Sequence, residues 1–424
     1  MIIRAGNVVT MDGAPITGGA IRVHGDRIVE VGKFSELAPP SKAFEAKEPV
    51  VDLGEHVLLP GLINAHCHLD YTCLRGKIPR QNSFADWIRV INAEKAKLTR
   101  NDYLRSIADG FAEAQRFGTT SIVNLEAFPE LIPKLHALPL RTWWCAELID
   151  VNAQEKFGEI VSEAFRNLKS IPNDRGGFGL GPHAPFTASA ELYRVCEKIA
   201  RRERLLLTTH IAESREEMEM FCRRSGRLFA FLKSLGRPMD DCGAITPLAI
   251  FLEKLNERPP DDASRELGVN RPYQGWLIAH LNELADTDFD LLAKLPQLLS
   301  VAHCPRSHAY FGHSPFAFER LDALGVNICL GTDSLASNTD LSLFAEMREF
   351  RRLHTGVPAE KILAMITVNP ARAIRAEDRL GKIRAGYQAD MIAIPTTSEA
   401  SSAYESIISF NGDVFWMMIG GEMA

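Results

Sequence analysis

The sequence predicts an α/β fold in which a (β/α)8 TIM barrel carries a small β-sandwich domain built from both chain ends. The central part alternates short apolar runs with longer helical patterns, which is typical of βα units around a parallel sheet. Eight such runs over about 320 residues match the strand number of a barrel. The two ends carry further strand patterns, and these need partners because a small sheet alone cannot bury both of its faces.

The chain ends supply the strands of the predicted small domain. Residues 1–59 read as short strands with tight turns, and His24-Gly25-Asp26 is a hairpin-type turn signal between two of them. Two more strand patterns lie within residues 377–424. We therefore expect residues 1–59 plus 377–424 to form the small β-domain and residues 60–376 to form the barrel.

The barrel strands are the short apolar runs of the central part. In chain order they are expected at residues 61–68, 119–124, 141–148, 177–183, 205–210, 276–280, 298–303 and 326–333. The widest gap, between the fifth and sixth runs, holds helical sequence and a polar loop at 257–271. Long polar loops in compact folds are usually functional, so we interpret this one as a surface insertion or a lid.

The composition is that of a soluble globular enzyme, with 46% hydrophobic and 24% charged residues. A net charge of −6 does not indicate a nucleic acid or an anionic membrane as partner. No apolar run reaches the roughly 18–20 residues needed to cross a bilayer, and Arg4, Gly6 and Asp12 interrupt any signal-peptide pattern. We expect a cytoplasmic protein with a small-molecule substrate, no nucleic acid and no membrane as partners; a homo-oligomer is compatible with the sequence.

Six of the eight predicted strands end in a residue type that binds metals or transfers protons. The first ends in His66 and His68, whose i, i+2 spacing directs both imidazoles to one side of a strand. The other ends carry His183, His210, His280, His303 and Asp333. Because the carboxyl ends of barrel strands meet at one face, where active sites lie, we expect these side chains to meet there, except His303, which we expect in the core.

Four stretches of sequence carry a resemblance to a known family. They are His66-Cys67-His68 and residues 181–185, 210–214 and 330–338. They resemble the amidohydrolase superfamily, and within it the cytosine/adenosine deaminase-like branch. That branch includes methylthioadenosine/S-adenosylhomocysteine deaminases, aminofutalosine deaminases and triazine hydrolases. The resemblance covers nearly the whole chain, including the small β-domain.

The resemblance implies one divalent metal ion, with zinc preferred and iron as the alternative. Its ligands are then His66, His68, His210 and Asp333. Three imidazoles and a carboxylate suit Zn²⁺ or Fe²⁺ better than Mg²⁺. The binuclear branches of the superfamily carry a carboxylated lysine at the end of strand four, where this chain has His183. We therefore expect a single metal.

The remaining strand-end residues are expected to perform the chemistry. A bound divalent cation lowers the pKa of its water toward about 7 and so provides hydroxide at neutral pH. Glu213 lies three residues after His210, where its carboxylate reaches both that water and the substrate. The resemblance implies that His280 orients the hydroxide and that His183 hydrogen-bonds the substrate. Asp333 then doubles as ligand and base.

The candidates for substrate binding beyond His183 are less specific. Arg306 and His308 follow strand seven on the active face and suit a substrate anion or hydroxyl, but Pro-Arg-Ser also makes a good turn. The branch commonly has Asn where His308 stands, and His313 is likewise unusual. Trp87 and Glu94 are similar to the Trp and ribose-binding Glu of nucleoside deaminases, although the spacing is shorter and the usual Trp-Pro is absent.

We interpret the chain as a metal-dependent hydrolytic deaminase of an aminated heterocycle, with an adenosine-derived nucleoside as the first choice. Metal-bound hydroxide would attack the ring and ammonia would leave. One alternative is a chlorohydrolase or amide-ring hydrolase of the same superfamily, although ring opening generally goes with a binuclear site. An alternative of another class is a catalytically silent metal-binding scaffold, which would have no need for Glu213 and His280 beside bound water. The sequence leaves the exact substrate and the oligomeric state open.

Overall fold

A computed structural model gives the fold of the chain. It describes residues 1–37, 48–135, 139–151, 157–171, 175–256, 275–295, 299–396 and 402–424. The polar loop that we expected at 257–271 lies outside these residues. Among the described helices, none has the length and apolar character needed to cross a membrane.

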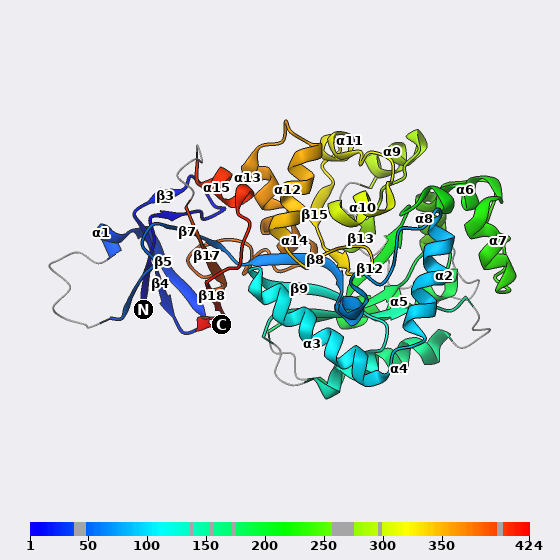
Figure 1. Cartoon of the computed structure of the whole chain (residues 1–424), viewed down its shortest axis with the longest axis horizontal. Helices are drawn as coiled ribbons and strands as arrows, with labels where there is room; N and C mark the ends of the chain where they lie inside the picture. The colour runs from blue at the N-terminus through cyan, green and yellow to red at the C-terminus, as the bar shows by residue number, and fades with distance from the viewer. Residues whose placement is uncertain are drawn as a thin grey trace, which may run out of the picture.

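The central element is a curved sheet whose paired strands are all parallel, and it is surrounded by helices (Figure 1). Its order is β15-β14-β13-β12-β11-β10-β9-β8-β16. The strands are β8 Leu62–His68, β9 Thr119–Glu126, β10 Arg141–Leu148, β11 Gly177–Pro182, β12 Leu206–Ile211, β13 Trp276–His280, β14 Leu299–His303, β15 Asn327–Leu330 and β16 Asp333–Ser334. The fold is a TIM-barrel-like α/β fold, and each strand lies where an apolar run predicted one.

The barrel closes through a break in its last strand. Residues 326–333 were expected as one strand, but β15 pairs with β14 and β16 pairs with β8 at the other edge. Between the two pieces, the Gly331 amide donates to the His303 carbonyl at 2.9 Å and the Thr332 amide donates to the His66 carbonyl at 3.1 Å. Gly331 permits this closure, because a Cβ there would lie 2.7 Å from the His66 carbonyl oxygen.

The strands are buried because helices cover the outer face of the sheet and side chains fill its interior. Every residue of β8 and of β9 is buried, as expected for parallel strands with both faces covered. The helices are α1 Phe34–Leu37, α2 Phe84–Lys95, α3 Arg100–Arg116, α4 Phe157–Lys169, α5 Ala190–Glu203, α6 Arg215–Arg223, α7 Gly226–Ser234, α8 Pro247–Asn256, α9 Asp286–Ala293, α10 Pro305–Phe311, α11 Phe318–Ala323, α12 Leu343–Leu353, α13 Ala359–Ala364, α14 Val368–Ala373 and α15 Ala403–Ser409, with 3-10 turns η1 Leu69–Leu74 and η2 Pro129–Lys134.

Two smaller sheets lie at one end of the molecule, where strands from the N-terminal and C-terminal parts of the chain come together (Figure 1). Their orders are β5-β4-β1-β6 and β19-β18-β17-β7-β2-β3. The strands are β1 Ile2–Arg4, β2 Asn7–Val8, β3 Ile16–Thr17, β4 Gly19–His24, β5 Arg27–Lys33, β6 Val50–Asp52, β7 His56–Pro60, β17 Met391–Pro395, β18 Trp416–Ile419 and β19 Glu422–Met423. The hairpin expected around Gly25 is present, since β4 and β5 pair antiparallel with His24 opposite Arg27.

Both chain ends contribute to one apolar core between these small sheets. Ile3 and Ile21 of the four-stranded sheet belong to the same buried cluster as Leu58, Met391 and Trp416 of the six-stranded sheet. Strand β7 pairs antiparallel with β17, so the N-terminal and C-terminal segments share a ladder. The partner that the sequence required for the N-terminal strands is therefore the C-terminal segment.

Candidate active site

Four residues predicted as metal ligands converge at the carboxyl ends of the barrel strands. We call them the ligand cluster: His66 and His68 of β8, His210 of β12 and Asp333 of β16. The Nε2 atoms of His68 and His210 are 3.4 Å apart. Asp333 Oδ1 lies 3.7 Å from His66 Nε2 and 3.9 Å from His68 Nε2. All four side chains are buried.

The ligand cluster fits a divalent metal by its donor set and by its unpaired nitrogens. Among the described residues, both ring nitrogens of His66 lack a hydrogen-bond partner although the side chain is fully buried. Buried polar atoms without partners are costly, and a bound ion between these residues would satisfy them. The ligand atoms of His66, His68 and Asp333 lie within 4.8 Å of one another, as do those of His66, His210 and His280. Three nitrogens and one carboxylate oxygen suit zinc or iron(II).

The backbone selects the metal-binding tautomer of His210. Its Nδ1 lies 2.8 Å from the His183 carbonyl oxygen, so Nδ1 carries the proton and Nε2 is left unprotonated toward His68. Burial, reinforced by neighbouring histidines, lowers the pKa of His210 to about 3 and holds the pKa of His68 well below its ordinary value. Both imidazoles are thus neutral, which is the form that ligates a metal.

Two hydroxyl groups orient the Asp333 carboxylate. Ser307 Oγ donates to Asp333 Oδ2 at 2.6 Å and Ser337 Oγ donates to the same oxygen at 3.3 Å, which leaves Oδ1 toward the histidines. Burial alone would raise the pKa of Asp333, but its contact with His66 and the proximity of His280 hold that pKa well below the ordinary value. The side chain is therefore a carboxylate. Sequence reasoning missed both serines, although they lie inside motifs that it quoted.

Glu213 and His280 lie next to each other beside the ligand cluster. Glu213 Oε1 is 3.7 Å from His280 Nε2, and the His280 ring centroid is 5.5 Å from that of His66. Burial is the main cause that raises the pKa of Glu213 well above its ordinary value, and Asp333 and Glu217 add to it. A carboxyl group with a raised pKa is a stronger base than an ordinary carboxylate and is suited to carry a proton between water and a substrate.

The strand ends that carry these groups have unusual backbone conformations. His280 has φ 75°, Asp333 has φ 56° and Ala212, directly before Glu213, has φ 52°. Non-glycine residues rarely adopt positive φ, and such strain concentrates at functional sites. Glu213 precedes Ser214, which caps helix α6 by accepting from the Glu217 amide at 3.2 Å.

His183 lies against the ligand cluster on a short turn after β11. Its ring centroid is 4.8 Å from that of His210, and its Nδ1 is 2.6 Å from Thr187 Oγ1. Burial lowers the pKa of His183 to about 3, so the ring is neutral. The position suits a hydrogen bond to a bound molecule.

Arg306 and His308 lie on α10 but have different surroundings. The Arg306 guanidinium binds Asp340, with Nη1 2.6 Å from Oδ1, and also contacts Thr339. His308 Nδ1 is 3.0 Å from Asn282 Oδ1. The side-chain Nδ2 of Asn282 donates to the Glu213 backbone carbonyl at 3.1 Å. His308 is therefore linked to the Glu213 segment, whereas Arg306 is engaged in an ion pair.

Trp87 and Glu94 both lie on α2. The Trp87 ring packs edge-on against Phe311 at 5.0 Å between centroids, and Phe311 stacks on His313 at 5.2 Å. Trp87 is thus connected to the end of α10. The Glu94 carboxylate forms an ion pair with the exposed Lys97 at 2.6 Å.

A group of buried acids near the ligand cluster was missed by sequence reasoning. Asp70 and Glu126 are fully buried, and Glu147 Oε1 lies 4.0 Å from His68 Nδ1. Burial and the neighbouring Glu147 raise the pKa of Asp70 to about 8. Each acid lies at or just after the carboxyl end of a predicted strand, which is the signal that would have found them.

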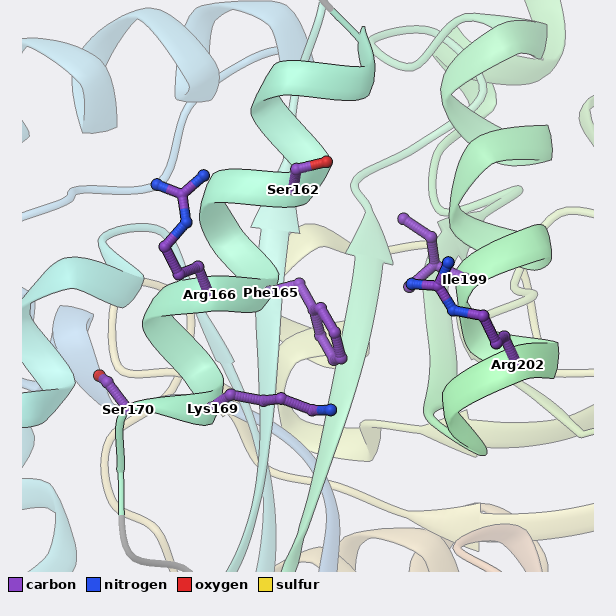
Figure 2. A pocket seen from close by; sticks show the side chains of 7 residues that line it. All are labelled: Ser162, Phe165, Arg166, Lys169, Ser170, Ile199 and Arg202. Atoms are coloured by element: carbon purple, nitrogen blue, oxygen red, sulfur yellow. The ribbon is translucent and has the colours of Figure 1, made fainter.

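One surface pocket lies far from this chemistry in the fold. It has a volume of about 520 Å³ between helices α4 and α5 and is drawn in Figure 2. It is lined by Ser162, Phe165, Arg166, Lys169, Ser170, Ile199 and Arg202. None of these is a candidate site residue, and Lys169 pairs with Glu203 at 2.8 Å.

The chain is similar in sequence to known deaminases. The model of the amidohydrolase family matches residues 57–423. A 5-methylthioadenosine/S-adenosylhomocysteine deaminase of Pyrococcus furiosus is 28% identical over 443 residues, covering 100% of this chain and 94% of the relative. Another, of Syntrophobacter fumaroxidans, is 30% identical over 412 residues, covering 93% and 84%. A 5'-deoxyadenosine deaminase of Methanosarcina mazei is 29% identical over 406 residues, covering 93% and 84%.

Solved structures share the fold along the whole chain. Helicobacter pylori aminofutalosine deaminase in complex with methylthio-coformycin has a TM-score of 0.84 at 20% identity, covering 100% of this chain and 99% of its own. An adenosine deaminase from Xanthomonas campestris with bound zinc has a TM-score of 0.79 at 23% identity, covering 100% and 92%. An atrazine chlorohydrolase of Arthrobacter aurescens complexed with zinc has a TM-score of 0.78 at 16% identity, covering 100% and 94%.

Proposed function

Because the chain belongs to the amidohydrolase family, we propose that it is a metal-dependent deaminase that hydrolyses the amino group of an adenosine-derived nucleoside. The observation that carries the proposal is the contact between the ligand cluster and the Glu213–His280 pair, which joins a metal site to a proton carrier. The sequence relatives are named for deamination of adenosine derivatives, which supports this substrate class.

The residues present fit one divalent metal, zinc by preference and iron as the alternative. His66, His68, His210 and Asp333 would hold it, and a bound divalent ion makes water a nucleophile at neutral pH. Asp333 Oδ2 accepts a hydrogen bond from Ser307, so only Oδ1 faces the histidines.

Glu213 and His280 would manage the protons and the charge of the reaction. Water adds to the ring carbon that bears the amino group, and one of its protons passes through Glu213 to the adjacent ring nitrogen. The second proton passes to the amine, with Asp333 as base. Ammonia then leaves and the carbon keeps the oxygen as a carbonyl. His280, 3.7 Å from Glu213, would stabilise the charge that develops on that oxygen.

The substrate is expected to lie between the ligand cluster and the elements that carry His183, His308 and Trp87. His183 offers a ring nitrogen to a polar substrate group, and the Trp87–Phe311 pair offers aromatic faces. Glu94 and Arg306 stay further candidates for substrate contact, and both would have to exchange a present ion-pair partner for the substrate.

Two other functions compete with this proposal. The support for a chlorohydrolase of the same family is limited to the fold that this chain shares with the triazine hydrolases. A silent metal-binding scaffold would not need to bury Glu213 beside His280, which is costly without a chemical purpose.

An assay of released ammonia and chloride distinguishes these functions. The zinc-loaded protein would be incubated with adenosine, 5'-deoxyadenosine, methylthioadenosine, adenine, guanine, cytosine and a chlorinated triazine. We expect an adenosine-type nucleoside to be best and to exceed its free base by roughly tens- to thousands-fold, because ribose groups satisfy buried polar atoms. A free base or a triazine as the best substrate would refute the nucleoside assignment.

We also propose that residues 1–59 plus 377–424 form a separate β-sandwich domain beside a barrel at 60–376. The apolar core shared by the two small sheets supports this division. Removing residues 1–55 would leave β7 paired with β17 but would uncover Leu58, Met391 and Trp416. We expect an insoluble protein in a centrifugation assay. A soluble and active truncation would contradict the proposal.

A further inference from the structure

The turn at residues 183–189 connects His183 to the outer helices. It begins after β11 and contains Thr187, whose hydroxyl is 2.6 Å from His183 Nδ1. The His183 carbonyl accepts from His210 Nδ1 at 2.8 Å. The turn thus orients the His183 ring through one hydrogen bond. Through another, it fixes the tautomer of His210.

Two buried cations bind the backbone carbonyls of this turn from outside the barrel. Lys254 of α8 donates through Nζ to the carbonyls of Pro185 and Ala188, both at 2.8 Å. Arg237, which follows α7, donates through Nε to the Phe186 carbonyl at 2.7 Å and through Nη2 to the Pro185 carbonyl at 3.3 Å. Three carbonyls of the turn are therefore held by side chains from two other elements.

Asp241 completes this arrangement as the anion that both cations share. Its Oδ2 lies 2.7 Å from Arg237 Nη2 and 3.3 Å from Lys254 Nζ, and its Oδ1 lies 2.8 Å from Arg237 Nη1. We call Arg237, Asp241 and Lys254 the clamp.

Every N–H group of the two cations in the clamp has an acceptor. The ammonium of Lys254 has three donors, which match Pro185, Ala188 and Asp241. The remaining donor of Arg237 Nη1 reaches the Pro238 carbonyl at 2.5 Å, so all five guanidinium donors are used.

The two cations of the clamp are buried, whereas Asp241 is half-buried. The side chains of Arg237 and Lys254 are 7% and 8% exposed. A buried network in which each donor is satisfied fixes one conformation of the groups that it binds, because any other conformation leaves a buried polar group unpaired.

We propose that Arg237, Asp241 and Lys254 are positioning residues that fix the turn at 183–189 and thereby aim the His183 ring at the substrate. The proposal rests on the proposed function in one respect, namely that His183 meets the substrate. The clamp touches neither the substrate nor the ligand cluster; it acts through the carbonyls of the turn. A purely structural clamp would lower stability and leave the handling of substrate unchanged.

A double-mutant cycle tests whether the clamp acts through His183. Lys254→Met keeps the length of the side chain and removes its three donors, and Lys233→Met at the exposed end of α7 is the matched control. With the best substrate of the ammonia assay, we expect Lys254→Met to lower kcat/KM by about tenfold or more, mainly through KM, at unchanged metal content. In a His183→Ala background, Lys254→Met should lower kcat/KM by less than about twofold, because the ring that the clamp aims is absent. Equal effects in both backgrounds would overturn the proposal.

Hydrogen exchange gives a second readout that needs no activity. The amides of Thr187 and Ala188 donate to the Ala184 carbonyl at 2.9 and 2.8 Å, so they should be protected in the native chain. We expect faster exchange of peptide 183–189 in Lys254→Met, beyond any change in the rest of the chain, and no change in Lys233→Met. If Lys254→Met fails to fold, the milder Asp241→Asn should give the same local change.

The two readouts separate the failure of the clamp from the failure of the proposed function. Unchanged exchange in a folded variant would reject the clamp whatever the substrate is. Local loosening of the turn together with best activity on a free base or triazine would retain the clamp and reject the nucleoside assignment.

Discussion

At the scale of the single residue, Glu213 is the side chain whose loss should separate chemistry from metal binding. We predict that Glu213→Gln retains the metal and loses activity by roughly a hundredfold or more, since an amide of the same size cannot carry the proton. Ammonia release and elemental analysis measure the two effects. Glu219→Gln, on the following helix α6, is the control and should be as active as the native chain. An active Glu213→Gln protein that has lost its metal would make Glu213 a ligand instead.

The lowered pKa of His308 predicts how the unfolding free energy depends on pH. Burial lowers its pKa to about 4, whereas an unfolded chain has a histidine pKa of about 6.5. Between these values the unfolded chain binds the extra proton, so the His308 contribution is intact above about pH 6.5 and is lost as the pH falls toward 4. On going from about pH 7.5 to pH 5, the native protein should therefore lose about 2 kcal/mol more of its unfolding free energy than His308→Gln. Urea unfolding at both pH values measures this difference. Equal losses of unfolding free energy in the two proteins would show that another group causes the loss of stability at acidic pH.

The amino-acid sequence predicted these residues unevenly. Strand-end position drew attention to the histidines and Asp333, the resemblance to a family implied the roles of the ligand cluster and of His280, and the structure brings these side chains together with Glu213. Ser307 and Ser337 were not found, because a hydroxyl that orients a carboxylate has no spacing rule of its own. The clamp was not found either, since its partners are backbone carbonyls that carry no mark in the sequence.

At the scale of the element, the broken last strand of the barrel depends on Gly331. A methyl group there would approach the His66 carbonyl oxygen to 2.7 Å, so β8 and β16 would have to separate. We predict that Gly331→Ala costs about 1–3 kcal/mol, as overpacking does, and lowers metal content because Asp333 moves away from His66. Thermal unfolding and elemental analysis check both effects. Gly356→Ala is the control, because a Cβ at Gly356 meets nothing within 4 Å; a Gly331→Ala protein as stable as this control would contradict the argument.

The strand positions were predictable from the sequence because parallel barrel strands are buried on both faces and appear as short apolar runs. The break between β15 and β16 was not, because an apolar run does not record which neighbour each residue pairs with. For the same reason, the apolar pattern near the N-terminus does not record that β1 and β2 belong to different sheets.

At the scale of the whole molecule, the chain is an amidohydrolase-family enzyme whose barrel and small sheets are joined by a buried ion pair. Arg141 of β10 binds Asp390, with Nη2 3.1 Å from Oδ1, and its Nη2 also donates to Gln388 at 2.7 Å. We predict that Asp390→Ala costs about 3–5 kcal/mol, because it leaves the Arg141 guanidinium buried without its charge partner.

The matched control for this pair is Glu422→Ala. Its pair with Arg175 is exposed on both sides, so its loss should change the unfolding free energy by less than about 1 kcal/mol. Denaturant unfolding of the three proteins gives the comparison. Equal stability of the two variants would mean that the Arg141–Asp390 pair does not hold the parts of the molecule together.

The ladder between β7 and β17 also bears on how the chain is made. Leu59 pairs with Ile392, which follows the whole barrel in the sequence, so the six-stranded sheet lacks half of its strands until the barrel has been synthesised. The N-terminal strands leave the ribosome first and wait with an unpaired edge while the barrel is synthesised. A stop codon shortly before residue 391 would thus harm a segment that had already been synthesised, since β7 would never receive its partner β17.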